Sequence, residues 1–217
     1  MSDPPAHVGL IPDGMRRWAQ SNGTTLADSY LRGAHKVVEI LGILQRHEVR
    51  TVTVYNLSRA NLGRRDDELD AVYQASTRFF RDLIPAHFDP GVCGVRLHGD
   101  RSLLPPSYVE AAELAETAMR GNDFHINILA AYDAVDEMRA AHRRAATSGG
   151  DIADAFEITE VDLVIRSTPE PLLSGFLPLQ SQYAQLRFLD TPLNDLQPEH
   201  IDDVIADYRH LPQLRGR

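Results

Sequence analysis

Short apolar runs alternate with longer amphipathic segments along this chain, and the alternation limits its fold more than any other feature. The runs are rich in β-branched residues or end in turn residues, which predicts strands at 7–11, 51–55, 94–97, 124–129, 162–165 and 185–188. Helical periodicity predicts helices at 15–21, 26–47, 66–87, 105–119, 134–146 and 198–208. Strands that alternate with helices predict an α/β fold with a central, mostly parallel six-stranded sheet flanked by helices. At 217 residues we expect one domain, 1–217.

Composition excludes several classes of protein. No apolar run approaches the roughly 20 residues of a membrane helix, and the N-terminus lacks the pattern of a signal peptide, so we expect a cytoplasmic protein without an integral membrane segment. The single cysteine, Cys93, rules out an intrachain disulfide and a cysteine-based metal site. A net charge of −9 argues against a nucleic-acid partner.

A strand, a tight turn and a helix follow one another at residues 11–18, with Asp13 and Gly14 in the turn and Arg16 and Arg17 on the first helical turn. Free N–H groups at a helix start and two guanidinium groups favour a phosphate ligand, and a carboxylate beside them can hold Mg²⁺. The alternative is that Asp13 caps the helix and the arginines are solvated. Ligands of open parallel sheets lie beyond the carboxyl ends of the strands, which is also where Ser58, Asn61 and Arg166 fall.

Four ordered blocks resemble the cis-prenyltransferases, the undecaprenyl diphosphate synthase family. Residues 7–18 are similar to H-V-A-x-I-x-D-G-N-x-R-W-A, and residues 55–64 to Y-x-F-S-x-E-N-W-x-R. Residues 127–132 resemble N-I-A-x-x-Y-G, and the stretch from 162 to 174 resembles D-L-V-I-R-T-G-G-E-x-R-x-S. The resemblance covers nearly the whole chain and implies a prenyltransferase that uses an allylic diphosphate donor, a small-molecule acceptor and Mg²⁺.

The resemblance also implies roles for individual residues. Asp13 would carry Mg²⁺, Ser58 and Asn61 would lie at the reacting carbon, and Arg166 and Ser174 would face the acceptor. The prenyl tail would lie between the helices at 26–47 and 66–87, and the protein would be a homodimer. The donor would contact Gly14, Met15, Arg16, Arg17, Trp18, Tyr30 and Arg64.

Departures from the family pattern concentrate where the family binds a second diphosphate. Leu172 stands at the position of a diphosphate-binding arginine, Gln185 at that of a Mg²⁺-sharing glutamate, and Thr168-Pro169 replaces a Gly-Gly pair. Hydrogen bonds to charged groups contribute roughly 1.5–3 kcal/mol each, so these losses weaken a site for isopentenyl diphosphate. We expect Leu172 to form part of an apolar wall instead.

The donor side departs as well, at Met15, Leu26 and Tyr30. The segment 10–30 is most similar to a Streptomyces-type subgroup that makes irregular prenyl units, as cyclolavandulyl diphosphate synthase does, or prenylates carbazoles. At the C-terminus, Arg215 and Gly216 resemble a family motif that can reach a neighbouring subunit's site; a frayed tail is the alternative.

Three functions follow from these patterns. The first is transfer of a dimethylallyl or geranyl group to a neutral, carbazole-like aromatic acceptor in secondary metabolism. The second is synthesis of an irregular or regular cis-prenyl diphosphate. The third is a non-catalytic partner subunit, against which the retained Asp13, Arg17, Ser58 and Asn61 argue.

Overall fold

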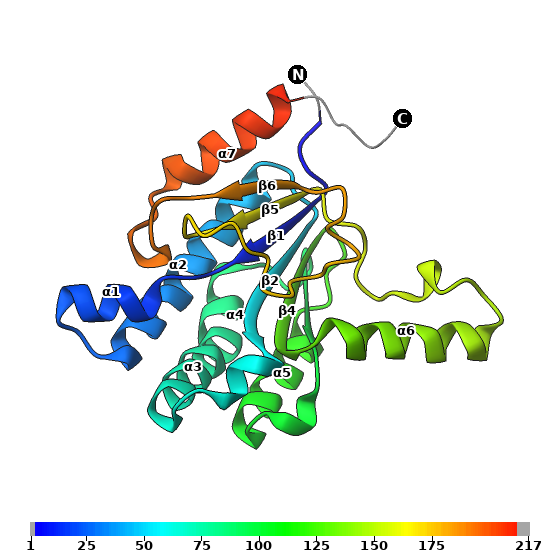
Figure 1. The fold of residues 1–217 in the computed structure, drawn as a ribbon, viewed down its shortest axis with the longest axis horizontal. Coiled ribbons are helices and arrows are strands. Elements are labelled where there is room, and N and C mark those ends of the chain that lie inside the picture. Colours follow the sequence, from blue (N-terminus) through cyan, green and yellow to red (C-terminus); the bar gives the residue numbers. More distant parts are fainter. Residues whose placement is uncertain (1–2, 212–217) are drawn as a thin grey trace.

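The computed structural model describes residues 3–211 and is built on one six-stranded sheet (Figure 1). Its strands are β1 (His7–Ile11), β2 (Thr51–Ser58), β3 (Cys93–His98), β4 (Phe124–Tyr132), β5 (Leu163–Arg166) and β6 (Gln185–Phe188). They lie in the order β3-β4-β2-β1-β5-β6, and every pair of neighbours is parallel. The expected α/β fold with a parallel sheet is confirmed.

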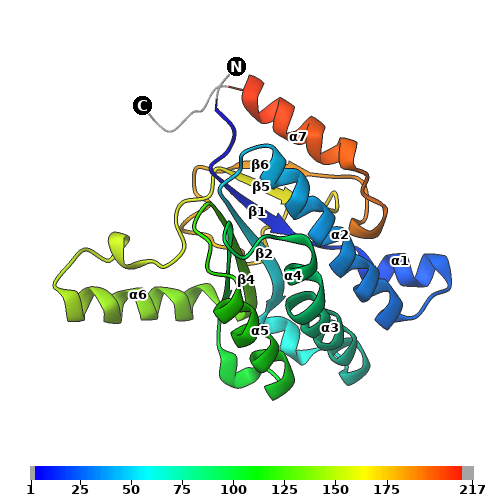
Figure 2. The same cartoon turned by 180° about the vertical axis from the view of Figure 1, so that it is seen from behind.

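The helices alternate with the strands as the periodicity predicted. They are α1 (Met15–Asn22), α2 (Leu26–Arg46), α3 (Asp66–Arg78), α4 (Ile84–His87), α5 (Pro106–Ala118), α6 (Ala134–Ser148) and α7 (Pro198–His210). Figure 2 looks onto the face of the sheet that α2, α3, α4 and α5 cover, while α6 projects away from the body of the molecule. None of the helices in residues 3–211 has the length and apolar character needed to span a bilayer.

Each face of the sheet carries its own apolar core. On the helical face, side chains such as Leu41, Phe80 and Tyr108 pack against the strands. The opposite face has a smaller core around Val164 and Phe176, closed by the segments that follow α6 and β5 rather than by helices. Figure 1 shows these segments crossing in front of the strands.

Two elements differ from the sequence prediction in ways that shape the cavity. The helix expected at 66–87 is interrupted by a π-helical turn at Phe79–Leu83. Pro85 explains this, since it has no N–H to donate to the preceding turn and its ring crowds that turn. The strand expected at 51–55 runs on to Ser58, and its register against β4 shifts on both sides of Leu57. Such irregularities redirect side chains, and here they bring Asn56 and Ser58 to the cavity.

Candidate active site

A cavity of about 530 Å³ lies beyond the carboxyl ends of β1, β2 and β5. The connection after β1 leads to one half of the sheet and the connection after β5 to the other, so the strand order reverses between these two strands. That is where open parallel sheets place their ligands. Asp13 follows β1, Ser58 ends β2 and Arg166 ends β5, which brings the three side chains into one wall.

The turn from β1 into α1 depends on Gly14. Its φ is +93°, a left-handed conformation, and an added Cβ would lie 3.0 Å from Cβ of Pro192. The Ser167 hydroxyl oxygen accepts from the Asp13 N–H at 2.7 Å, and the Leu193 N–H donates to the Asp13 carbonyl at 3.1 Å. The start of α1, whose first residues line the cavity, is therefore held in a fixed position.

The Asp13 carboxylate is bound from three sides. Arg166 donates to Oδ2 at 2.7 Å, the Thr168 hydroxyl donates to the same oxygen at 3.2 Å, and the Gly14 N–H donates to Oδ1 at 2.6 Å. Burial raises the pKa of Asp13, but the hydrogen bonds from Arg166 and Gly14, the charge of Arg166 and the hydrogen bond from Thr168 outweigh burial and lower it. Asp13 is therefore an anion at neutral pH, a third exposed to the cavity.

The guanidinium groups of the cavity all pair with carboxylates. Arg17 pairs with Glu170 at 2.5 Å, and the hydrogen bond from Arg17 is the main reason that the pKa of Glu170 falls to about 2. Arg64 and Arg16 share Glu68, at 2.9 and 3.4 Å. Together with Arg166 and Asp13, four cations face three anions, so the cavity has a positive excess suited to a diphosphate.

Glu68 is a buried carboxylate that also fixes Tyr30. The Tyr30 hydroxyl donates to Oε1 of Glu68 at 3.2 Å, and burial, the first cause, raises the pKa of Tyr30 to about 12. Glu68 is 5% exposed, so it holds the Arg64 and Tyr30 side chains in place rather than contacting solvent.

Ser58 and Asn61 fix each other. The Asn61 N–H donates to Oγ of Ser58 at 3.1 Å, and the Ser58 N–H donates to Oδ1 of Asn61 at 3.3 Å. This reciprocal cap begins the short 3₁₀ helix Arg59–Gly63. The Ser58 hydroxyl donates to the hydroxyl of Tyr55, whereas the Asn61 amide Nδ2 has no hydrogen-bond acceptor among residues 3–211 and lies in the lining of the cavity.

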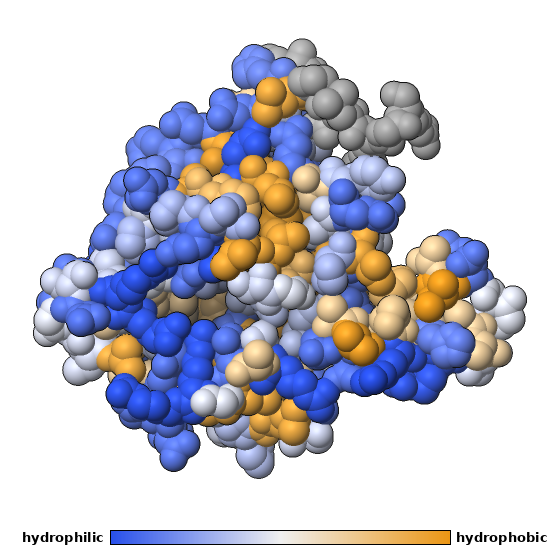
Figure 3. Space-filling view, in the orientation of Figure 1, coloured by the Kyte–Doolittle hydropathy of each residue, from blue (hydrophilic) through white to orange (hydrophobic). Residues whose placement is uncertain are grey.

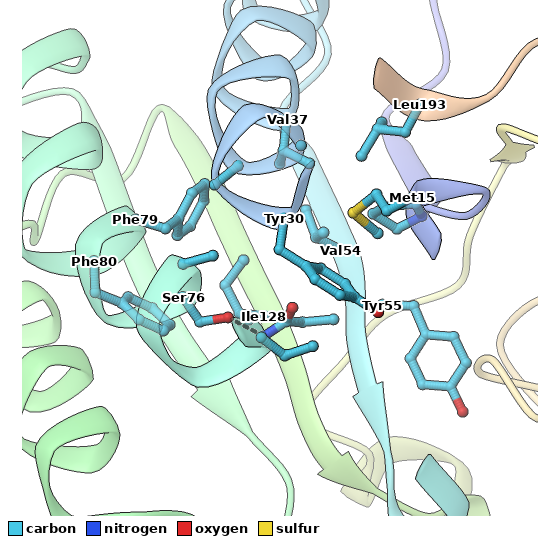
Figure 4. A pocket seen from close by; sticks show the side chains of 16 residues that line it. Met15, Tyr30, Val37, Val54, Tyr55, Ser76, Phe79, Phe80, Ile128 and Leu193 are labelled. Carbon is cyan, nitrogen blue, oxygen red and sulfur yellow. Dashed lines mark hydrogen bonds between the residues drawn. The ribbon is translucent and has the colours of Figure 1, made fainter. Parts of the chain in front are cut away.

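A narrower apolar arm of about 60 Å³ opens from the same cavity between α2 and α3 (Figure 4). Val37, Val72, Phe79 and Ile128 are among its lining side chains. Pro12, Met15, Tyr30, Tyr55 and Asn56 line both spaces and form the junction between them. A molecule with an anionic head and a short hydrocarbon tail fits this pair of spaces.

The structure brings most of the predicted site residues together. Those that line the main cavity are Asp13, Gly14, Met15, Arg16, Arg17, Tyr30, Ser58, Asn61, Arg64, Arg166 and Ser174. Trp18 does not line it. Its indole N–H donates to Asp195 at 2.8 Å and Arg32 lies over its ring, so Trp18 anchors α1 instead.

Leu172 and Gln185 also lie outside the cavity of the single chain. The Leu172 side chain is 58% exposed, so the apolar wall expected there is not present in this chain. Gln185 is the first residue of β6 and pairs with Leu163, the first residue of β5. The cavity lies at the other end of these strands, three residues further on, where Arg166 pairs with Phe188. At about 3.3 Å per residue, this places Gln185 roughly 10 Å along the strand direction from that end.

Sequence reasoning missed Glu68 and Glu170. Glu68 lies in the first turn of α3, four residues after Arg64, which precedes the helix and pairs with it. Glu170 occupies the glutamate position of the fourth block, so the signal for it was present in the sequence.

Among residues 3–211 no group of three or more histidine, cysteine, aspartate or glutamate side chains is placed to hold a metal ion. Mg²⁺ commonly takes one or two carboxylates and completes its shell with water and substrate phosphates. Asp13 fits that pattern as a single hard-oxygen ligand, because its ionised carboxylate is partly open to the cavity.

Comparison with known proteins agrees with this geometry. The family model described as putative undecaprenyl diphosphate synthase matches residues 11–215. The (2Z,6E)-farnesyl diphosphate synthase of Mycobacterium tuberculosis is 32% identical, over 100% of this chain and 89% of the relative. Isoprenyl transferase 1 of Corynebacterium diphtheriae is 31% identical, over 86% of this chain and 77% of the relative. The crystal structure of lavandulyl diphosphate synthase from Lavandula x intermedia, in complex with dimethylallyl diphosphate, superposes with a TM-score of 0.87 at 25% identity, over 99% of both chains.

The parallel sheet with an arginine-lined cavity at its switch point is typical of α/β proteins that bind phosphate-bearing ligands. The family match is more specific. The chain belongs to the undecaprenyl diphosphate synthase family, the cis-prenyltransferases, and is a prenyltransferase.

Proposed function

We propose that this enzyme transfers a short allylic group from its diphosphate to an acceptor that carries no diphosphate, with an electron-rich aromatic ring as the expected class. The donor diphosphate binds Arg16, Arg17, Arg64 and the start of α1, and its tail enters the apolar arm.

In the reaction, the bond between the allylic C1 and the diphosphate oxygen breaks, and the electron pair leaves on the diphosphate. Arg17 and Arg64 stabilise this charge, and the Asn61 amide, which lines the same cavity, donates to the departing oxygen. An electron pair of the aromatic ring forms the new C–C bond, and the ring then loses a proton to a diphosphate oxygen.

Asp13 would hold Mg²⁺ against the donor diphosphate. The ion supplies charge stabilisation to the leaving group. Asp13 itself keeps Arg166 paired and positions the turn that starts α1.

The contacts of Arg166 are the observation that carries the proposal. Its Nε donates to Thr168, its Nη2 to Asp13, and its Nη1 to Ser174 at 3.1 Å and to the carbonyl of Leu172. The residue is 7% exposed. A second diphosphate would have to displace these protein oxygens from the only family arginine left at the acceptor position, and Ser174 is engaged in the same contact. These contacts therefore support an acceptor that does not need a positively charged side chain to bind it.

A second candidate is a cis-prenyl diphosphate synthase, regular or irregular. The names of the relatives favour it, since the Mycobacterium tuberculosis protein is named as a farnesyl diphosphate synthase and the Lavandula x intermedia protein as a lavandulyl diphosphate synthase. The Streptomyces-type aromatic subgroup and a role in secondary metabolism stand as proposals beside it.

One product assay separates the two candidates. The enzyme is incubated with dimethylallyl diphosphate and Mg²⁺ in three mixtures: alone, with isopentenyl diphosphate, and with carbazole- or indole-type acceptors. Diphosphate release and product masses are then measured. The proposal predicts a prenylated aromatic product only. A C10 diphosphate in either of the first two mixtures, with every aromatic ignored, would establish the synthase instead.

A further inference from the structure

Tyr55 on β2 joins two sides of the main cavity through its hydroxyl. This hydroxyl donates to the carbonyl of Ser174 at 3.1 Å and accepts from the hydroxyl of Ser58. Ser58 in turn accepts from the Asn61 N–H at 3.1 Å. Figure 4 shows the ring of Tyr55 directed away from the other side chains of the apolar arm. One line of hydrogen bonds therefore runs from Asn61, at the departing diphosphate, to Ser174 on the opposite wall.

The segment that receives this hydrogen bond has an unusual backbone. Ser174, Gly175 and Leu177 have φ values of +52°, +85° and +34°. Residues other than glycine rarely adopt a left-handed φ, and they keep it only where the surrounding structure holds them. Ser174 is held at two points, by Arg166 on its Oγ at 3.1 Å and by Tyr55 on its carbonyl. The place of Ser174 in the cavity wall therefore depends on both contacts.

The ring of Tyr55 is fixed independently of its hydroxyl. It packs against the ring of Phe176, with centroids 5.6 Å apart, and edge-on against Tyr132 at 6.0 Å. Both neighbours are buried. Burial is the main reason that the pKa of Tyr55 is raised, so the hydroxyl keeps its proton at neutral pH and can donate to the carbonyl. Phenylalanine at this position would keep the packing and remove only the two hydrogen bonds.

We propose that Tyr55 is a positioning residue for prenyl transfer: its hydroxyl holds Ser174 at a fixed distance from Ser58, and so places the acceptor against the allylic carbon of the donor. This inference rests on the proposed function in placing the acceptor beside Ser174, a placement that serves an aromatic ring and isopentenyl diphosphate alike. Reacting atoms must approach within about 3–3.5 Å, so a shift of the Ser174 segment slows transfer without weakening the binding of the donor.

The test measures donor binding and transfer separately in Tyr55→Phe. Calorimetry gives the Kd of dimethylallyl S-thiolodiphosphate, a poorly reactive donor analogue. Rates of diphosphate release from dimethylallyl diphosphate and Mg²⁺ give kcat and KM for carbazole, indole and isopentenyl diphosphate as acceptors. Tyr55→Phe should keep the donor Kd within about twofold of wild type and lower kcat/KM for the acceptor at least tenfold. Tyr73→Phe, which removes the hydroxyl of another ring packed edge-on against a neighbour, should match wild type in both.

Each result decides a separate point. A kcat/KM within threefold of wild type in Tyr55→Phe, or a donor Kd that weakens as much as kcat/KM falls, would overturn the inference and leave the proposed function intact. Product from isopentenyl diphosphate alone would overturn the proposed function, and kcat/KM for that acceptor would then decide the inference. Release of diphosphate with none of the three acceptors would overturn both. If Tyr55→Phe does not fold, Tyr55→His, whose shorter ring cannot reach the Ser174 carbonyl, takes its place with the same expectation.

Discussion

Asp13 combines structural and chemical roles at one position. Its backbone joins β1 to α1 through Ser167 and Leu193, while its carboxylate pairs with the nearly buried Arg166. Removing the whole side chain would leave Arg166 without its counter-ion, which is costly in a buried place. Asparagine keeps the shape of the side chain and an oxygen acceptor, so it removes the charge, and with it the counter-ion of Arg166, without leaving a cavity.

Asp13→Asn should lower kcat at least 100-fold in a protein that still folds, with a melting temperature lowered because Arg166 loses its counter-ion. The amide can still accept from Gly14 but no longer offers a full negative charge to Mg²⁺. Steady-state kinetics across a range of Mg²⁺ concentrations checks this. Asp203→Asn, at an exposed position of α7, is the matched control. A kcat within threefold of wild type and an unchanged Mg²⁺ profile would remove Asp13 from the mechanism.

Gly14 sets the direction of α1, and its conformation is one that side chains rarely adopt. Gly14→Ala adds a Cβ at φ +93° against Pro192. A left-handed conformation costs a non-glycine residue roughly 1–2 kcal/mol, which in a chain of this size lowers the melting temperature by about 2–8 °C. Differential scanning calorimetry checks this against Gly63→Ala, which has open space around it. Equal melting temperatures for the two variants would show that the turn is unstrained.

At the scale of elements, one buried histidine links three strands. His7 on β1 donates from Nδ1 to the carbonyl of Glu160, and its Nε2 lies 2.8 Å from the hydroxyl of Thr53 on β2. Thr53 in turn accepts from Asn127 on β4 at 3.2 Å. Burial is the main reason that the pKa of His7 falls from its ordinary value of 6.5 to about 4.

This depressed pKa predicts a loss of stability in mild acid. Between pH 6.5 and pH 4 the unfolded chain binds a proton at His7 that the folded chain does not, so the free energy of unfolding rises with pH across this window and falls as the pH is lowered. The contribution of His7 amounts to about 3 kcal/mol. Burial also lowers the pKa of His98, which acts in the same direction.

Chemical denaturation at pH 7 and pH 4.5 measures the effect. His7→Gln should reduce the difference between the two pH values by about 2–3 kcal/mol, whereas His35→Gln, at an exposed position of α2, should leave it unchanged. The same pH dependence in His7→Gln and wild type would contradict this assignment.

The elements that the sequence predicted well are those with strong local signals. The helix at 26–47 was expected from its repeating apolar positions, and the structure ends it one residue earlier, at Arg46. The π-helical turn before Pro85 and the register shift around Leu57 depend on tertiary packing and have no periodic signature. The four sequence blocks that resemble the family placed Asp13, Arg64 and Arg166 in one site. They could not give the side-chain contacts of Trp18 and Arg166, because these contacts join residues more than 150 positions apart in the chain or depend on loop geometry.

At the scale of the whole molecule, one face of the sheet lacks a helical layer. Apolar side chains on and near this side are exposed, including Val135 and Met138 of α6 and Leu179, Tyr183 and Leu186. Figure 3 shows hydrophobic residues gathered in the centre of this face. We propose that residues 1–217 fold as one domain and that a second copy of the chain covers this face, as the family resemblance implies. Arg215 and Gly216 lie outside the described residues.

Light scattering should give a mass twice the 24.2 kDa of the chain. Val135→Glu with Met138→Glu places two charges on the exposed side of α6, where burial against a partner would require their desolvation. This variant should be a folded monomer. A monomeric wild type at micromolar concentration would contradict the proposal.

We propose that this enzyme binds one diphosphate, not two. Calorimetry of isopentenyl diphosphate into enzyme saturated with Mg²⁺ and dimethylallyl S-thiolodiphosphate measures the second site directly. The contacts of Arg166, which occupy four of its five N–H groups, predict no binding below millimolar concentrations. A one-to-one isotherm with a micromolar Kd would contradict the account and identify the chain as a prenyl diphosphate synthase.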